Sequence, residues 1–392
     1  MPFDRRVWQE CCSLTAAGWN VTVICPRGTK RDTEPLARID GVTIHRYPLV
    51  AATGGPAGYV REYATALFHV HRLARRCAAR SLPSVVHACN PPDLLLPAVS
   101  FLKRRGSAFV FDHHDLVPEL YESRFGRRTD PLYKLTLAAE RWTFRLADVV
   151  ISTNESYRRV AVERGGKRPE DVLVVRSAPD LTRFQTRPAD PTLRGDRPFL
   201  LAYLGVMGPQ DGVDHALRAL RLLRDRRDDW RAIFIGEGDV SDQMRALTRE
   251  LGLGADVTFT GRLPDEDVLR ILSSADVCLA PDPMNPLNDV STMNKIVEYM
   301  ALERPVVSYD LVEARVSAGD AALYATANDE AAFAACIEQL FDDPERRVRM
   351  GQAGRARLRD TLSWQSSEIE LLRAYDRALS IHRARTARKP RR

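Results

Sequence analysis

Short apolar runs rich in Val and Ile alternate along this chain with longer stretches of helical spacing, and this alternation restricts the possible folds more than any other feature. Residues 232–236 form one such run, and Leu217, Leu220 and Leu223 before it recur at the spacing of a helix face. Continuous apolar strands that alternate with amphipathic helices are typical of an α/β fold whose parallel sheet is covered on both faces. Strands are expected at 20–25, 42–46, 84–87, 108–112 and 148–152, and in a second series at 172–176, 199–204, 232–236, 257–261, 277–280 and 305–309.

Two series of strands indicate two doubly wound domains. A proline-rich segment without periodicity, 178–198, is expected to link an N-terminal domain, 1–177, to a C-terminal domain, 199–363. A helix at 364–382 is expected to pack back on the N-terminal domain, and a basic tail at 383–392 is expected to be disordered. Open parallel sheets bind ligands outside the carboxyl ends of their strands, so the functional site is expected in a cleft where the two domains face each other.

Charge and cysteine content exclude several classes of protein. The net charge of +6 comes from the tail, so the rest of the chain is neutral, which argues against nucleic-acid binding. No apolar run reaches the ~18 residues of a membrane-spanning helix, and a cytoplasmic protein is expected. Seven Cys without a C-x-x-C spacing indicate neither a disulfide framework nor a structural zinc site. The basic residues of the tail are Arg383, Arg385, Arg388, Lys389, Arg391 and Arg392.

A glycine-containing turn follows one of the expected strands and opens a helix. Gly205, Gly208 and Gly212 would let the backbone approach a phosphate at the helix N-terminus. The spacing is neither the dinucleotide fingerprint nor that of a Walker A loop, so a tight turn without a ligand is the alternative. A second pair, Gly236 and Gly238, is more simply interpreted as a structural turn.

The segment 286–301 carries the densest set of candidate binding residues. Ser291 and Thr292 stand where a helix is expected to begin, and Asn294, Lys295 and Glu298 follow on one side of it. The helix start offers N–H groups to an anion, Lys295 offers a charge, and Glu298 can accept hydrogen bonds from ribose hydroxyls. The alternative is an N-capped helix whose Lys and Glu side chains are merely solvated.

This segment, with residues 305–307 after it, resembles the donor-site motif of family-4 retaining glycosyltransferases of the GT-B fold. The similarity is greatest to the bacterial polysaccharide and O-antigen branch, with its signature N-K-x-x-E-Y-M-A. The resemblance implies two Rossmann-like domains and transfer of a sugar from a nucleotide-diphosphate sugar to a glycan or lipid-linked acceptor in cell-surface polysaccharide biosynthesis. It extends over nearly the whole chain, through residues 3–10, 111–119, 175–177, 205–212 and 261–264.

The resemblance also implies roles for residues at the donor. The second Glu of the family's Glu-x7-Glu motif, here Glu298, binds the ribose, whereas the first position is Val290, and Asp289 beside it is the candidate substitute. Lys295, helped by the backbone amides of residues 291–293, is expected at the phosphates, and Arg262 beside the nucleobase. The donor-binding residues expected are Gly205, Gly208, Gln210, Arg262, Ser291, Thr292, Met293, Asn294 and Glu298.

In the N-terminal half, residues 111–115 resemble the segment that carries the family's strand-end histidine. His114 is assigned to the reaction centre, and Asp115 and Glu119 to the acceptor region. A lone His on an apolar strand is usually a core residue, but polar residues after a strand end favour a cleft. His87 is a weaker candidate that could equally be structural. The expected catalytic residues are His114, Asp289 and Lys295.

No metal and no cofactor besides the donor are expected. The sequence shows no carboxylate pair suited to act as nucleophile and acid, and Asp265 and Asp267 stand where acids interact with a helix N-terminus. Transfer with retention is therefore expected through an oxocarbenium-like state, with the departing diphosphate accepting the acceptor's proton.

Family members begin with a strand and a glycine-containing loop, and this chain starts after both. The N-terminal domain is therefore expected to lack its first, central strand, and we hypothesise a start assigned too late or a truncated chain. A longer, active native product found by intact-mass measurement would support this, and an active enzyme beginning at Met1 would reject it.

Two other functions are compatible with the sequence. A nucleotide-sugar 2-epimerase of the GT-B fold would consume its substrate without an acceptor, and a catalytically silent nucleotide-sugar-binding protein would bind without turnover. The basic amphipathic stretch 63–76 either packs on the N-terminal sheet or docks on an anionic membrane, at the inner face of the plasma membrane, that carries a lipid-linked acceptor.

Overall fold

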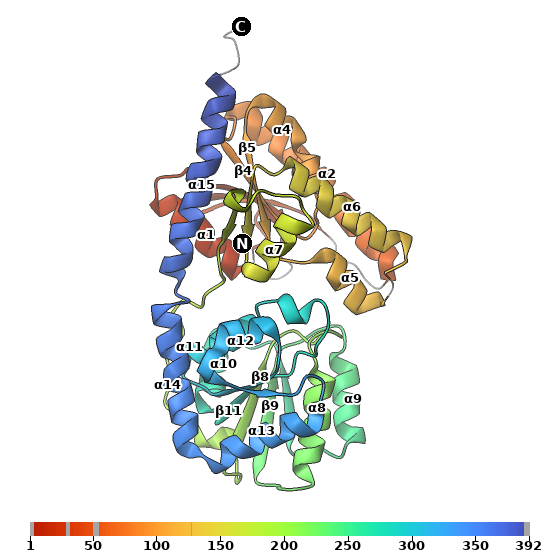
Figure 1. Cartoon of the computed structure of the whole chain (residues 1–392), viewed down its shortest axis with the longest axis vertical. Helices are drawn as coiled ribbons and strands as arrows, with labels where there is room; N and C mark the ends of the chain where they lie inside the picture. The colour runs from red at the N-terminus through yellow and green to blue at the C-terminus, as the bar shows by residue number, and fades with distance from the viewer. Residues whose placement is uncertain (1–3, 29–31, 50–54, 127, 388–392) are drawn as a thin grey trace. The chain divides into compact units, whose positions relative to one another are not determined.

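The structure is a computed structural model that describes residues 4–28, 32–49, 55–126 and 128–387. It divides into two compact α/β units (Figure 1). The first unit comprises Met1–Tyr121, Arg127–Ser177 and Gln365–Arg392, and the second Glu122–Gly126 and Ala178–Trp364.

A four-stranded parallel sheet forms the centre of the first unit. Its order is β4-β5-β6-β7, from β4 (Val85–Cys89), β5 (Ala108–His113), β6 (Val149–Ser152) and β7 (Val172–Val174). Every residue of β5 is buried, as the continuous apolar run predicts for a strand covered on both faces. Because β7 pairs with β6, it belongs to the first series of strands and not to the second, where the sequence placed it.

A second, three-stranded sheet in the first unit has the order β1-β3-β2, from β1 (Thr22–Pro26), β2 (Leu36–Ile39) and β3 (Val42–Tyr47). The sequence predicted β1 and β3 but missed β2, which pairs antiparallel with β3 across the turn Asp40–Gly41. Both turn residues have positive φ, 48° and 83°, and an Asp-Gly pair is the usual signal for such a hairpin. The expectation of an absent first strand concerns residues before the described part and stays a prediction.

The long C-terminal helix α15 (Trp364–Ala387) is tied to the first unit by ion pairs. Arg377 Nη2 lies 3.0 Å from Asp171 Oδ1, and Arg385 Nη1 lies 2.7 Å from Asp148 Oδ2. The helix continues past residue 383, so the expectation that disorder begins there is wrong; residues 388–392 lie outside the described part. The other helices of this unit are α1 (Arg5–Ala16), α2 (Gly55–Arg80), α3 (Leu95–Ala98), α4 (Ser100–Arg105), α5 (Val117–Phe125), α6 (Pro131–Leu146), α7 (Glu155–Glu163) and the 3₁₀ turn η1 (Pro169–Asp171).

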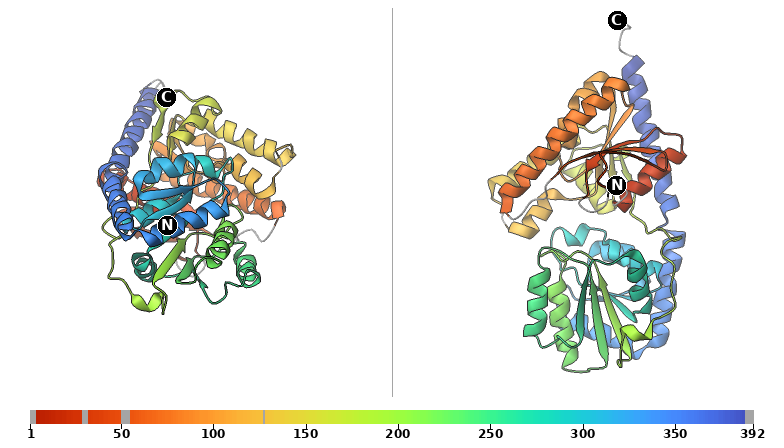
Figure 2. Two further views of the ribbon diagram at one scale, coloured as in Figure 1. Left: turned by 60° about the horizontal axis from the view of Figure 1, so that its bottom comes forward. Right: turned by 180° about the vertical axis from the view of Figure 1, so that it is seen from behind.

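The second unit contains a six-stranded parallel sheet, β10-β9-β8-β11-β12-β13, with helices on both of its faces (Figure 2). The chain order reverses between β8 and β11, and such a switch point is where open α/β sheets bind ligands. The sequence missed β13, whose Ala-rich segment lacks the Val and Ile of the others. The strands are β8 (Phe199–Leu204), β9 (Trp230–Ile235), β10 (Val257–Gly261), β11 (Val277–Ala280), β12 (Val306–Tyr309) and β13 (Ala322–Ala325).

Large side chains, including Trp230, Tyr203 and Tyr299, fill the core of this unit. Residues 178–198, expected as a linker, fall within the second unit, where the backbone N–H groups of Arg187 and Asp190 donate to hydroxyls at the end of α10. The remaining helical segments are η2 (Pro191–Leu193), α8 (Val213–Arg224), α9 (Ser241–Glu250), α10 (Asp265–Ser274), η3 (Asn288–Val290), α11 (Asn294–Ala301), α12 (Val312–Ala318), η4 (Gly319–Ala321), α13 (Glu330–Asp342) and α14 (Pro344–Asp360).

A substitution at Asp148 tests how much its ion pair with Arg385 of α15 stabilises the first unit. Its carboxylate pairs with Lys103 at 2.9 Å and with Arg385, and accepts from the N–H of Phe109 at 2.8 Å. We expect Asp148→Asn to reduce the free energy of unfolding by ~2 kcal/mol, because hydrogen bonds to a charged group are lost. Thermal and urea unfolding would measure this, with Asp376→Asn, an exposed position on α15, as the control.

The same contacts determine how the contribution of Asp148 to the free energy of unfolding depends on pH. Burial raises the pKa of Asp148, but the bonds from Arg385 and Lys103 outweigh it and leave the pKa below its ordinary value. The stabilisation is therefore present at neutral pH and is lost as the pH falls through the pKa of the folded state. A difference between wild type and variant that grows on acidification would contradict this account.

Candidate functional site

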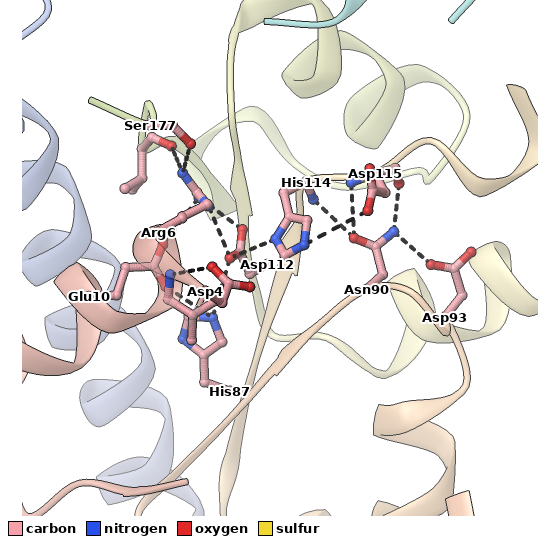
Figure 3. Close-up of polar contacts among 12 residues, drawn as sticks. Asp4, Arg6, Glu10, His87, Asn90, Asp93, Asp112, His114, Asp115 and Ser177 are labelled. Carbon is pink, nitrogen blue, oxygen red and sulfur yellow. Dashed lines mark hydrogen bonds and ion pairs between the residues drawn. The ribbon is translucent and has the colours of Figure 1, made fainter. Parts of the chain in front are cut away.

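Asn90 organises the loop that follows β5 in the first unit. Its buried side-chain amide donates to Asp93 Oδ1 at 2.8 Å and to the carbonyl of Asp115 at 2.6 Å. Its oxygen accepts from the backbone N–H groups of His114, at 3.0 Å, and Asp115, at 3.1 Å (Figure 3). One amide thus fixes the path of both residues that the sequence placed at the reaction centre and acceptor, although Asn90 was not itself predicted.

Asp112, near the end of β5, is the charged partner of His114. Its fully buried carboxylate lies 3.1 Å from His114 Nδ1, and the two side chains point toward each other (Figure 3). Burial lowers the pKa of the imidazole, but the charge of Asp112 outweighs this and raises the pKa of His114 to about 9. His114 is therefore a cation at neutral pH and can donate from Nε2 while Nδ1 is held.

Arg6, in the first turn of α1, completes this arrangement and was missed by sequence reasoning. Its guanidinium donates to both carboxylate oxygens of Asp112, at 3.0 and 3.3 Å, and to the carbonyl of Val175 at 2.8 Å. Burial raises the pKa of Asp112, yet Arg6 and His114 together hold it well below its usual range. One turn later Glu10 lies 3.2 Å from Arg6, and burial and the charge of Asp112 raise the pKa of Glu10 to about 7.

His87, the weaker candidate, joins the same cluster from β4. Its Nδ1 lies 2.9 Å from the hydroxyl of Tyr375 on α15. Its Nε2 lies 3.7 Å from Glu10 Oε2 and 3.8 Å from Asp112 Oδ2. The structure therefore brings His87 and His114 to one carboxylate, from two neighbouring strands.

The two residues assigned to the acceptor region have different surroundings. Asp115 keeps a carboxylate that is 44% exposed, 4.0 Å from His114 Nε2. Glu119 is instead paired with Arg164, with Oε2 3.1 Å from Nη2, and Arg164 also contacts the buried Glu140 at 2.6 Å. Glu119 thus belongs to an internal ion-pair network, so of the two Asp115 is better placed to meet a ligand.

His87, Cys89 and Asp112 have side-chain donor atoms within 4.8 Å of one another, close enough to suggest a metal site. The Oδ2 atom of Asp112 already accepts from Arg6 Nε and lies in hydrogen-bond contact with His114. A metal ion would have to displace one of these cations, so the three residues do not form an open ligand set.

In the second unit, the glycine-containing turn links β8 to α8 at the switch point. Asp211 Oδ2 accepts from the N–H of Gly208 at 2.9 Å, and Gly212 has a φ of +68°. A Cβ atom at Gly212 would lie 2.0 Å from the carbonyl oxygen of Pro281 after β11. The side chain of Asn288 donates to the carbonyl of Gln210 at 2.9 Å, so the turn is tied to the segment before α11.

The two glycines after β9 touch this turn directly. A Cβ atom at Gly236 would lie 1.8 Å from the carbonyl oxygen of Gly205, and one at Gly238 would lie 2.5 Å from that of Met207. Such contacts are possible only for glycine. The interpretation of Gly236 and Gly238 as structural residues is therefore supported, and their role is to bring two backbone turns into contact.

Lys295 lies beneath the same turn. A Cβ atom at Gly205 would lie 3.3 Å from Lys295 Cε, and the buried ammonium group contacts Asp282 Oδ1 at 2.7 Å. Burial lowers the pKa of Lys295, but the charges of Asp282 and Asp211 outweigh this and raise it. Lys295 is thus a cation at the switch point, and Asp282, which sequence reasoning missed, holds it there.

The start of α11 differs from the prediction. The helix begins at Asn294, with Met293 at the N-cap position, so the expected start at Ser291 and Thr292 is wrong. The physical reason is a preceding 3₁₀ turn: the Ser291 hydroxyl donates to the carbonyl of Leu287 and its N–H to that of Asn288. The N–H of Ser291 is therefore used within the turn and not offered to an anion.

Further candidate residues lie on several separate elements of the second unit. Glu298 is partly exposed on the second turn of α11, and Arg262 is exposed directly after β10. Asp289 Oδ1 accepts from the N–H of Val312 at the start of α12, at 2.9 Å, so this carboxylate has a structural contact. Asp265 and Asp267 lie in the first turn of α10, as predicted for acids at a helix N-terminus.

A cavity of about 380 Å³ in the second unit has Asp267 of α10 in its wall. Arg231, Thr258 and Arg270 are among its lining side chains, and none of the predicted site residues lines it. The glycine turns and Lys295 are therefore the better candidate, because they combine the switch point, a held cation and close backbone approach.

Doubly wound parallel sheets, with glycine-containing turns at the switch point of the second unit, define the class: this is a GT-B glycosyltransferase fold, as the sequence predicted. Residues 4–178 match the family described as Glycosyl transferase 4-like domain, and residues 198–343 match Glycosyl transferases group 1. Both matches are to glycosyltransferase families, and together they span most of the chain.

Similar proteins include a glycogen synthase of Mycobacterium tuberculosis, 26% identical, in a match that covers 95% of this chain and 90% of that one. The structure is similar to a sucrose-phosphate synthase from Thermosynechococcus elongatus, with a TM-score of 0.75 and 19% identity, covering 95% of this chain and 92% of that chain. It is also similar to Anabaena HepE in complex with UDP and glucose, with a TM-score of 0.66 and 16% identity over 91% and 100% of the two chains.

The pairing of Asp112 with His114 predicts a titration. In Asp112→Asn the charge that raises the pKa of His114 is gone, while burial and the charge of Arg6 still lower it. We expect the pKa of His114 to fall from about 9, since Asp115 is then the remaining charge that raises it. NMR titration of the histidine Cε1–H signals would measure this. Asp115→Asn, which removes a more distant and exposed charge, should lower it less, and an unchanged pKa in Asp112→Asn would refute the pairing.

The contact between the glycine turns predicts a sharp difference between two alanine substitutions. Gly236→Ala places a Cβ atom against the carbonyl of Gly205 at a φ of +133°, so we expect a loss of ~2 kcal/mol or more in unfolding free energy. Gly254→Ala has nothing within 4 Å and should be nearly neutral. Thermal unfolding compares them, and equal melting temperatures would show that the turns do not touch.

Proposed function

We propose that this glycosyltransferase moves a sugar, with retention of anomeric configuration, from a nucleotide-diphosphate sugar to a glycan or lipid-linked acceptor in cell-surface polysaccharide biosynthesis. The observation that carries the proposal is Lys295, held as a cation by Asp282 against the glycine turn at the switch point. A diphosphate is the ligand that suits a cation beside closely approaching backbone turns. The similar HepE structure contains UDP and glucose.

Lys295 has its main effect on the leaving group. As the bond between the anomeric carbon and the phosphate oxygen breaks, negative charge develops on the departing nucleotide diphosphate. The ammonium of Lys295 stabilises that charge without moving, because Asp282 already fixes its position. Glu298 accepts from the ribose hydroxyls, and Arg262 lies beside the base. The departing oxygen takes the proton of the acceptor hydroxyl as the new glycosidic bond forms on the same face of the sugar.

His114 is proposed to meet the sugar. With Nδ1 held by Asp112, the charged ring donates from Nε2 to a sugar oxygen. Asp115 beside it would bind a hydroxyl of the acceptor. No metal ion takes part in the proposed reaction, because Lys295 supplies the positive charge at the diphosphate, and no cofactor is needed besides the donor.

The proposed substrates indicate where in the cell this protein would act. Nucleotide sugars are cytoplasmic metabolites, and a lipid-linked acceptor would be presented at the inner face of the plasma membrane, so we propose peripheral contact of a cytoplasmic protein with that membrane. Among the helices that the structure describes, none is both long and apolar enough to cross a bilayer.

The test is nucleotide release from UDP-, GDP- and dTDP-sugars in the presence of membrane extract and EDTA. We expect release with one donor only when extract is present, and a ~100-fold lower rate in Lys295→Ala, the range found when one charge-stabilising donor is removed. Glu298→Ala should raise KM for that donor, whereas Glu266→Ala, an exposed acid on α10, should change nothing.

Other outcomes would overturn the proposal in distinguishable ways. Release without an acceptor, together with a changed sugar, would indicate the 2-epimerase. Tight binding of a nucleotide sugar without turnover would indicate a binding protein. Loss of activity with EDTA, restored by a divalent ion, would refute metal independence, and NMR of the product would show whether the anomeric configuration is retained.

A further inference from the structure

The solvent-facing side of α2 combines large apolar and basic side chains. Along residues 60–80 of this helix, all of which the structure describes, the one acidic residue is Glu62, which is partly buried. Val60, Ala64 and Phe68 recur every four residues, and Phe68 is 63% exposed. The exposed arginines of the same stretch are Arg61, Arg72, Arg75, Arg76 and Arg80.

The helix α6 shows the same combination independently. Trp142 is 53% exposed and Leu135, two turns earlier, is 59% exposed. Lys134, Arg141 and Arg145 are exposed beside them, whereas the acid of this helix, Glu140, is buried and paired with Arg164. Two helices that are far apart in the sequence thus present the same surface chemistry.

The two helices belong to one part of the first unit. Both α2 and α6 contact α3, and both run along the same side of the unit in the two views that show them (Figures 1 and 2). Exposed apolar residues elsewhere have other neighbours: Ile369 on α15, 61% exposed, lies beside Glu370, which pairs with Arg373 at 2.7 Å. Ile369 thus differs from the exposed apolar residues of α6, a helix whose one acid is buried.

We propose that the exposed faces of α2 and α6 form a docking surface for an anionic lipid bilayer. Arginine and lysine side chains are attracted to the negative headgroups, and Val60, Phe68, Leu135 and Trp142 enter the boundary between headgroups and acyl chains. A Trp with an apolar body and a polar N–H is suited to that boundary. A purely electrostatic partner would leave these four apolar side chains in water. The inference deepens the proposed function, since it names the surface that would bring the enzyme to a lipid-linked acceptor.

The experiment is co-sedimentation of the full chain with vesicles, without donor or acceptor, so that its outcome does not depend on transferase activity. We expect binding to phosphatidylglycerol-containing vesicles at least tenfold tighter than to pure phosphatidylcholine vesicles, weakening as salt is raised. The double variant Phe68→Ser/Trp142→Ser should lose at least tenfold in affinity for the anionic vesicles.

A matched control distinguishes binding through this surface from non-specific binding through any exposed apolar residue. The double variant Ile369→Ser/Val348→Ser removes two other exposed apolar residues, 61% and 58% exposed, and should bind vesicles like the wild type. All four positions are on the surface, so unchanged thermal unfolding can be checked first. Absence of vesicle binding, equal affinity for neutral and anionic vesicles, or full binding by the Phe68→Ser/Trp142→Ser variant would each overturn the proposal. If the enzyme transfers sugar but does not bind vesicles, the proposed transferase function stands and the proposed docking surface is refuted.

Discussion

A single buried carboxylate, that of Asp112, holds together the candidate site of the first unit. Its charge is offset on one side by the guanidinium of Arg6 and on the other by the imidazolium of His114. A buried carboxylate is costly unless it is paired and hydrogen-bonded, so each partner is needed where it lies. Through these contacts α1, the end of β5 and the segment after β7 are fixed to one another, since Arg6 also binds the carbonyl of Val175. The charged state of His114 follows from the same pairing.

In the second unit the equivalent constraint is close backbone approach. The turns after β8, β9 and β11 meet within distances that exclude a Cβ atom at Gly236 or Gly212. Lys295 lies against these closely packed turns and pairs with Asp282, so a cation is held at the switch point. The two units therefore share one arrangement. A helix places a basic side chain at a strand end, Arg6 from α1 and Lys295 from α11, and there it pairs with an aspartate.

Much of the fold could be predicted, because strands and helices depend on local patterns. The apolar runs predicted β5, β8 and β10 almost to the residue, and the family signature led to Lys295 and His114. The short Ala-rich β13 and the hairpin strand β2 lacked that pattern. The start of α11 was misplaced, because Ser291 looks like a cap but closes a 3₁₀ turn with Leu287 and Asn288 instead.

The residues that sequence reasoning missed share one property. Arg6, Asn90 and Asp282 act through partners that are distant along the chain or lie across a turn, and such pairings leave no periodic or spaced signal. By itself the sequence determined the alternation of strands and helices, the glycines that allow the turns and the family of the protein, because these depend on neighbouring residues. Only the tertiary structure decided which charges meet, that Glu119 is bound to Arg164 and that Asp115 stays partly exposed, because burial and pairing arise when distant segments pack together.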